Sequence, residues 1–353
     1  MKSMTASLTV LLALSTPLAS LAQTNRNMNP NESPTNLPGA TTIAAPPADF
    51  DPLTASDQDL QYYGFPPRPN QATDTKAYAS WVKAMKASKT RVVPVLEQTS
   101  IFHGPAQLVK NPTAGENESA VSSSSSNTSY TSNWSGYVDQ SGATRYGSSS
   151  FYFTVNEMVV PVAEQAYGAC TGGWDYGSAW NGIDGWGSGD VLQAGFEFDA
   201  YCSIFTKASY YSAWYEWYPY GEVRISSLPV SPGDDIFVEV WHTSSTQGYA
   251  YLVNYNTDKA VEVGFTAPSG HALIGNSAEW VVERPTVGGS LATLTNYIAD
   301  PFWNAYAYTE SSVFYDTNGA NAVIMLDNSN KPISYPTWFG SESFLMQNEG
   351  SSR

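Results

Sequence analysis

Residues 191–199 read VLQAGFEFD, and their alternation predicts a β-strand with two different faces. One set of alternating positions is uniformly apolar: Leu192, Ala194, Phe196 and Phe198. Successive side chains of a strand point to opposite faces, so Gln193, Glu197 and Asp199 would share the face turned away from this apolar row. The strand therefore has one face for a core and one face that is either solvated or used for chemistry.

The same alternation of apolar and polar residues continues from Asn133 to the end of the chain. Short alternating stretches rich in Tyr, Trp, Val and Phe are separated by Gly, Ser, Asn and Pro, for example SSFYFTVNEMVVP (149–161), DDIFVEVWHTSS (234–245) and YAYLVNYN (249–256). Such spacing indicates an all-β domain. We expect residues 129–353 to form one antiparallel β-sandwich of two curved sheets, large enough to bury a substantial core.

The chain upstream of this domain has a different composition. Residues 1–22 combine a lysine, a short apolar run and small residues, which is typical of a secretory signal peptide, so we expect a secreted protein. Residues 23–128 are rich in Pro, Asn, Thr and Ala and end in a Ser-rich linker, so we expect a mostly irregular propeptide. Within it, residues 73–89 (TDTKAYASWVKAMKASK) predict one short amphipathic basic helix.

Charge is distributed unevenly along the chain. Asp plus Glu number 32 against 16 Lys plus Arg, which gives a formal net charge of -16, and from residue 129 onward 23 acidic residues face only seven basic ones. An acidic surface disfavours nucleic acid and anionic membranes as partners and suits an acidic medium. Acidity can also serve solubility alone. The basic helix could lie across the acidic domain and mask it, or belong to an independent adaptor.

Two further stretches place acids among aromatic residues. In YSAWYEWYP (211–219), Trp214 and Glu216 share one face of a strand. In SAEWVVE (277–283), Glu279 and Glu283 share one face in the same way. Large aromatic side chains around an acid are typical of a cleft on a curved sheet. No Asp-Thr-Gly, GxSxG or HExxH signature occurs, and three histidines and two cysteines are poor material for a zinc site.

Three functions fit these residues. In a jelly-roll glycosidase, Glu197 and Asp199 would be the paired carboxylates. In a peptidase, a glutamate would activate water and a glutamine amide, which does not titrate, would stabilise the oxyanion. A lectin-like module on the same sandwich would bind carbohydrate without catalysis.

Five ordered motifs resemble those of the glutamic peptidases of family G1, the eqolisins or scytalidoglutamic-peptidase-like enzymes. They are NWSGYV (133–138), AWNGIDG (179–185), VLQAG (191–195), YSAWYEWYP (211–219) and SAEWVVE (277–283). The resemblance implies a lectin/glucanase-like sandwich and an endopeptidase that acts on proteins in acid without metal or cofactor. The N-terminal segment resembles the proregion of bacterial relatives, so we expect a monomeric preproenzyme that its own propeptide covers.

The resemblance also implies roles for individual residues. The family's catalytic dyad falls on Gln193 and Glu283, which ranks Glu279 behind Glu283 as the base and leaves Glu197 and Asp199 without an assigned role. Supporting residues of the cleft fall in the same motifs: Trp134, Trp180, Asp184, Trp214 and Glu216. The cysteines lie elsewhere than in the fungal relatives, so the family's disulfide does not transfer. Cys170 and Cys202 are nevertheless expected to pair in an oxidising compartment.

Overall fold

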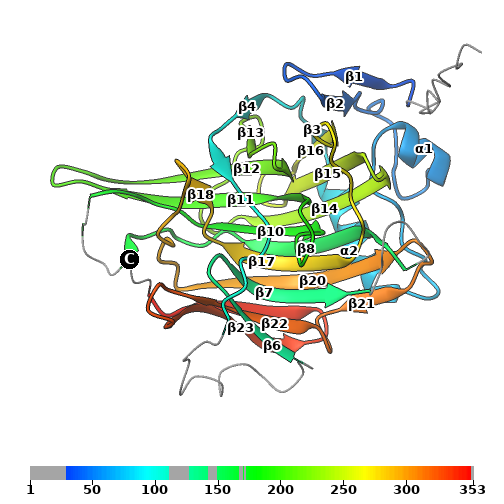
Figure 1. Cartoon of the computed structure of the whole chain (residues 1–353). Coiled ribbons are helices and arrows are strands. Elements are labelled where there is room, and N and C mark those ends of the chain that lie inside the picture. Colours follow the sequence, from blue (N-terminus) through cyan, green and yellow to red (C-terminus); the bar gives the residue numbers. More distant parts are fainter. Residues whose placement is uncertain (1–28, 111–126, 142–148, 167–169, 171, 351–353) are drawn as a thin grey trace, which may run out of the picture.

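The computed structural model describes residues 29–110, 127–141, 149–166, 170 and 172–350. The expected signal peptide, residues 1–22, lies outside them, as does most of the Ser-rich linker, residues 118–132. In the described part the fold is the predicted antiparallel β-sandwich (Figure 1). No helix of that part is long and apolar enough to cross a membrane.

The first sheet contains the strand that includes VLQAGFEFD, residues 191–199. In spatial order it is made of β13 (Val223–Ile225), β12 (Lys207–Tyr218), β11 (Val191–Cys202), β10 (Ser178–Ile183), β17 (Ser277–Glu283), β7 (Trp134–Gln140) and β22 (Asn321–Leu326). Two short strands extend its margins: β9 (Gly173–Asp175) beside β11 and β6 (Asn127–Thr131), which runs parallel to β22. Cys202 on β11 is bonded to Cys170, which confirms the expected disulfide.

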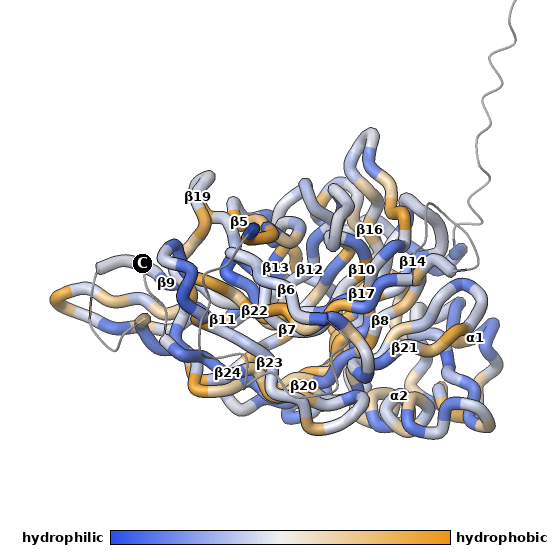
Figure 2. Tube along the Cα trace, turned by 60° about the horizontal axis from the view of Figure 1, so that its bottom comes forward, coloured by the Kyte–Doolittle hydropathy of each residue, from blue (hydrophilic) through white to orange (hydrophobic). Residues whose placement is uncertain are grey.

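The second sheet packs against the first. Its strands are β24 (Ser343–Asn348), β20 (Ala299–Thr309), β8 (Phe151–Val159), β14 (Asp235–Ser244), β15 (Gln247–Asn254) and β16 (Lys259–Thr266). Strand β23 (Pro332–Gly340) links it to β22 of the first sheet, and β21 (Phe314–Asp316) pairs with β20. Stretches of hydrophobic residues lie along strands of the sandwich such as β17 in Figure 2.

The core between the sheets is built from the alternating residues. The apolar set of β11 is buried there with Val238 and Val240 of β14 and Met158 of β8. The alternate residues of β11, from Gln193 to Asp199, lie on the outer face of the first sheet, as the sequence predicts. They are nevertheless buried, because another part of the chain covers them.

The covering chain is the N-terminal segment. The predicted helix is α2 (Thr75–Ala87), but the segment is less irregular than expected: it also forms α1 (Asp57–Tyr62), β1 (Glu32–Pro34), β2 (Ala40–Ile43), β3 (Thr90–Arg91), β4 (Leu96–Gln98) and β5 (Ile101–Phe102). Strands β2 and β3 pair with β16, and β4 pairs with β13, at sheet edges. These short strands take their partners from distant parts of the chain, so their local sequence carries little periodicity.

Helix α2 lies across the outer face of the second sheet (Figure 1). Its apolar side, including Trp81 and Met85, packs on the outward-facing aromatic residues of β8, β14, β15 and β20. Its lysines pair with carboxylates of the sandwich: Lys83 with Glu157 at 2.5 Å and with Asp235 at 3.1 Å, and Lys76 with Glu342 at 3.1 Å. The basic helix therefore contacts the acidic domain through charge as well as through apolar area.

The end of the N-terminal segment crosses the first sheet. We call residues 101–109 the crossing segment. It begins with β5, which pairs with β18 (Thr286–Val287) in a small sheet completed by β19 (Ser290–Leu291), and it ends where the backbone N–H of Val109 donates to Tyr130. Between these anchors it passes over the outer face of β10, β11 and β12, where His103 contacts Glu216 and Gln193.

Candidate active site

The polar residues of four neighbouring strands gather on the outer face of the first sheet. Gln193 on β11 lies opposite Glu216 on β12, and Glu283 on β17 lies opposite Ser178 on β10. Strand β10 also lies beside β11, where its Gly182 is opposite Gln193. A Cβ atom at Gly182 would sit 2.8 Å from the carbonyl oxygen of Leu192, so glycine is required for this close approach.

Gln193 binds the backbone of the crossing segment. Its Nε2 atom donates to the carbonyl oxygen of His103 at 2.5 Å, and the side chain is fully buried. On the other side of the same residue, the backbone N–H of His103 donates to Oε2 of Glu216 at 2.9 Å. Burial raises the pKa of Glu216 well above its usual range, and the charge and N–H of His103 only partly offset this. The two side chains thus hold one residue of an extended peptide by both of its backbone groups.

Glu283 is oriented by hydrogen bonds to both of its oxygens. The indole Nε1 of Trp180 donates to Oε2 at 3.0 Å, and Nδ2 of Asn133 donates to Oε1 at 3.3 Å. Trp134 packs edge-on against Trp180, with ring centroids 5.0 Å apart. Burial raises the pKa of Glu283, whereas His103, Asn133 and Trp180 oppose the shift.

The expected supporting residues occupy different places around this centre. Trp180 and Trp134 lie beside Glu283, and Trp214 stacks on the ring of His103 at a centroid distance of 4.0 Å. Asp184 instead anchors the loop that leads into β17: its two oxygens accept from the backbone N–H groups of Ile274 at 2.7 Å and Asn276 at 2.8 Å. Burial raises the pKa of Asp184 to about 6, although these backbone bonds lower it.

The side chain of His103 enters an acidic pocket beside the predicted dyad. Its Nε2 atom lies 2.8 Å from Oε1 of Glu197 and 3.3 Å from Oε2 of Glu222, and its Nδ1 atom lies 3.2 Å from Ser178 Oγ and 3.6 Å from Glu283 Oε2. Burial by itself lowers the pKa of His103, but the charge of Glu197 and the hydrogen bonds of the neighbouring carboxylates raise it well above its ordinary value. The ring is therefore a buried imidazolium.

Sequence reasoning missed this pocket. It left Glu197 without a role, treated His103 only as one of too few histidines, and did not consider Glu222. The alternation of VLQAGFEFD was the one available signal, because it places Glu197 on the face of Gln193. His103 is 94 residues earlier in the chain than Glu197, and no spacing rule connects them.

The pocket around the His103 ring is suited to a cation. His103, Glu197 and Glu222 offer ligand atoms within 4.8 Å of one another, which is compatible with a metal ion. The distances from the imidazole Nε2 to the two carboxylates are, however, those of direct contacts, so the ring itself occupies the place that a metal ion would take.

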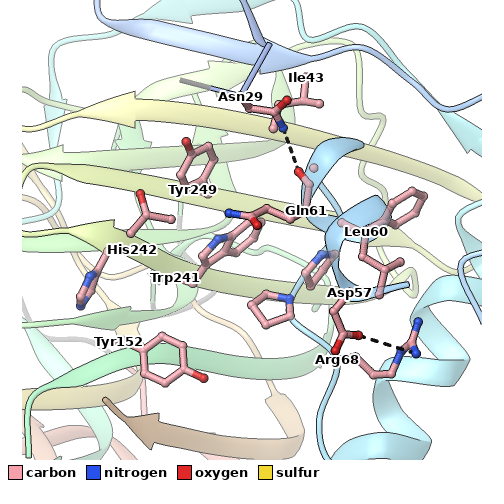
Figure 3. Close-up of a pocket in the computed structure, with 15 residues that line it drawn as sticks. Asn29, Ile43, Asp57, Leu60, Gln61, Arg68, Tyr152, Trp241, His242 and Tyr249 are labelled. Atoms are coloured by element: carbon pink, nitrogen blue, oxygen red, sulfur yellow. Dashed lines mark hydrogen bonds and ion pairs between the residues drawn. The ribbon is translucent and has the colours of Figure 1, made fainter. Parts of the chain in front are cut away.

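A more open cavity of about 400 Å³ lies on the other side of the sandwich. Trp241, His242 and Tyr249 of the second sheet line it together with residues of the N-terminal segment such as Gln61 and Arg68 (Figure 3). Arg68 is paired there with Asp57 at 3.7 Å. This cavity contains none of the predicted catalytic residues, and two thirds of its lining residues belong to the N-terminal segment, so we do not assign the chemistry to it.

Comparison with known proteins shows the family of the chain. A family model described as "Peptidase A4 family" matches residues 132–346. Aspergillopepsin-2 of Aspergillus niger is 34% identical over 196 residues, which cover 53% of this chain and 67% of that protein. Scytalidopepsin B of Scytalidium lignicola is 37% identical over 108 residues, 30% of this chain and 39% of that protein.

A solved structure is also similar. The crystal structure of scytalido-glutamic peptidase with a transition state analog inhibitor aligns with a TM-score of 0.51 and 25% identity, covering 62% of this chain and 98% of that one. Fold and matches together define a peptidase of the glutamic type, a hydrolase. The chain belongs to the Peptidase A4 family, the eqolisins, rather than to the glycosidases or lectins considered from the residues alone.

Proposed function

We propose that the chain is a secreted, acid-active endopeptidase in which Glu283 is the general base and Gln193 the oxyanion donor. The observation that carries the proposal is that Gln193 and Glu283 converge on a single residue of a bound peptide. Gln193 donates to the carbonyl oxygen of His103, and the carboxylate of Glu283 lies 3.6 Å from the His103 ring. A peptide substrate would take the place of the crossing segment.

The reaction needs one proton acceptor and one hydrogen-bond donor. Glu283 would take a proton from water as that water attacks the scissile carbonyl, and would then give the proton to the leaving amine. Gln193 would stabilise the negative charge on the carbonyl oxygen with an amide that does not change protonation in acid. The bonds from Trp180 and Asn133 would hold the Glu283 carboxylate in place throughout.

We further propose that the chain is a zymogen. In this proposal residues 1–22 are a signal peptide, residues 23–128 a propeptide with its linker, and residues 129–353 the monomeric catalytic domain. The contacts of His103 support this, because the crossing segment occupies the space that a substrate needs. Acid would favour release, since burial raises the pKa of Asp235 and protonation of this carboxylate removes its ion pair with Lys83.

A pair of variants tests the catalytic assignment. The full chain and its Glu283→Gln and Glu279→Gln variants are incubated at about pH 3 with a denatured protein, and new N-termini are sequenced. Glu279 is the matched control because it lies on the same strand and the same outer face and is also fully buried. We expect the parent and Glu279→Gln to digest the substrate and themselves, and Glu283→Gln to do neither. Digestion by Glu283→Gln near the parental rate would refute the assignment.

A further inference from the structure

The pocket that holds the His103 ring has a composition unlike that of an ordinary peptide-binding subsite. Its wall consists of the carboxylates Glu197 and Glu222, the hydroxyl of Ser178 and the indole of Trp214. Behind Glu197 lies Asp199, which is 1% exposed. The carboxylates contact the edge of the imidazole ring, and the indole of Trp214 stacks on its face, with the two ring planes 11° from parallel.

The backbone of His103 shows which substrate residue this pocket would receive. In the proposed reaction, the carbonyl bound by Gln193 belongs to the residue on the N-terminal side of the scissile bond. In the crossing segment that residue is His103, and the next is Gly104. A substrate bound with the same backbone contacts would place the side chain of the residue before the scissile bond between Glu197 and Glu222.

We propose that this pocket makes the enzyme select substrates with a cationic side chain, Arg, Lys or His, immediately before the scissile bond. The inference rests on the proposed function and adds a substrate class to it. Glu197 and Glu222 would be the specificity-determining residues. His103 would fill the pocket in the unprocessed chain until a substrate side chain displaces it.

The charge balance of the pocket carries this inference. Three carboxylates lie around the ring, those of Glu197, Glu222 and Glu283, and a fourth, that of Glu216, accepts from the backbone N–H of the same residue. A fixed cation lies beside them: Arg224, whose Nε pairs with the other oxygen of Glu222 at 3.0 Å. When His103 leaves, Glu222 loses one of its two cationic partners, and a neutral side chain would leave this buried carboxylate with Arg224 alone.

Glu222 is the carboxylate that would keep its charge in acid. Burial raises its pKa, but the hydrogen bond and charge of His103 and the charge of Arg224 outweigh burial, so the pKa is lowered overall. Arg224 is part of the domain and stays when the crossing segment leaves. The Trp214 plane adds attraction for a guanidinium or imidazolium ring stacked on it.

The test compares substrates that differ in charge alone. The full chain is processed in acid, and kcat/KM is measured at pH 4 for one peptide sequence with Arg, citrulline, Lys or norleucine before the cleaved bond. We expect kcat/KM to be about 30-fold or more higher for the Arg peptide than for the citrulline peptide, and likewise for Lys against norleucine. Removing one partner of a buried charge pair has an effect of that order. Equal rates for Arg and citrulline, or a preference for norleucine, would overturn the inference.

Variants then assign the preference to the pocket. Glu222→Gln should reduce the Arg-to-citrulline ratio to within about threefold, whereas Glu239→Gln, a buried carboxylate on the outer face of the second sheet, should leave the ratio unchanged. A ratio that persists in Glu222→Gln would contradict the assignment. The substrate comparison needs no variant to fold. Cleavage of all four peptides without preference refutes the cationic pocket alone, whereas failure to cleave any of them refutes the proposed function as well.

Discussion

Replacing Glu262 by Gln should change how the stability of the full chain depends on pH. Glu262 lies on β16, fully buried beneath the N-terminal segment, and its Oε2 accepts from the backbone N–H of Ile43 at 2.7 Å. Burial raises the pKa of Glu262 from 4.5 to about 7, while the charge of Arg91 and the Ile43 bond oppose the rise. The folded chain therefore binds this proton more tightly than the unfolded chain does.

The sign and size of the effect follow from that difference. A carboxyl whose folded-state pKa is raised contributes stability that is complete below about pH 4.5 and is lost as the pH rises through about 7. A rise from 4.5 to about 7 corresponds to roughly 3 kcal/mol of unfolding free energy. A glutamine at this position resembles the protonated acid in shape and charge, so the variant should not suffer the loss.

Urea unfolding at pH 4 and pH 8 measures the prediction. Both proteins carry Glu283→Gln, so that in the proposed mechanism they do not process themselves at pH 4. We expect the parent to lose roughly 3 kcal/mol more than Glu262→Gln between the two pH values. Glu97→Gln, at an exposed carboxylate of β4, is the control and should follow the parent. Parallel losses in the parent and Glu262→Gln would refute the reasoning.

Three further predictions concern catalysis, activation and stability. Gln193→Ala should lower kcat by about 100- to 1000-fold, since one oxyanion donor is removed; steady-state kinetics on a peptide would measure it, and a near-parental kcat would contradict the role. Lys83→Met should speed acid processing a few-fold at pH 5, as followed by gel electrophoresis, because it removes two ion pairs of a half-exposed side chain. Lys86→Met on the same helix is its control, and equal rates would count against electrostatic retention. Cys202→Ser should lower the unfolding free energy by about 3 to 4 kcal/mol, because the bond to Cys170 closes a loop with a sequence separation of 32; an unchanged urea midpoint would contradict this.

Local sequence was sufficient to predict features that belong to a single strand or helix. The alternation in residues 191–199 predicted a strand with a buried apolar face, and β11 has that face in the core. The spacing of Trp81 and Met85 predicted the amphipathic helix that became α2. In both cases the signal is the period of the side chains along one element, which the sequence displays directly.

Pairings between distant segments could not be predicted in this way. The parallel pairing of β6 with β22 and the docking of β4 on β13 join residues far apart in the chain, and no local period reports them. The same holds for the two backbone hydrogen bonds by which Asp184 holds the loop before β17. Which polar residue meets which is a property of sheet register.

The sequence by itself therefore determined the all-β class, the two faces of VLQAGFEFD and the placement of Gln193 and Glu197 together on one face. Only the tertiary structure decided that His103 enters that face, because its position depends on anchors at β5 and Tyr130 on either side of the first sheet. Side-chain periodicity is a local property of the backbone, whereas an ion pair between His103 and Glu197 exists only after the chain has folded back over its own sheet.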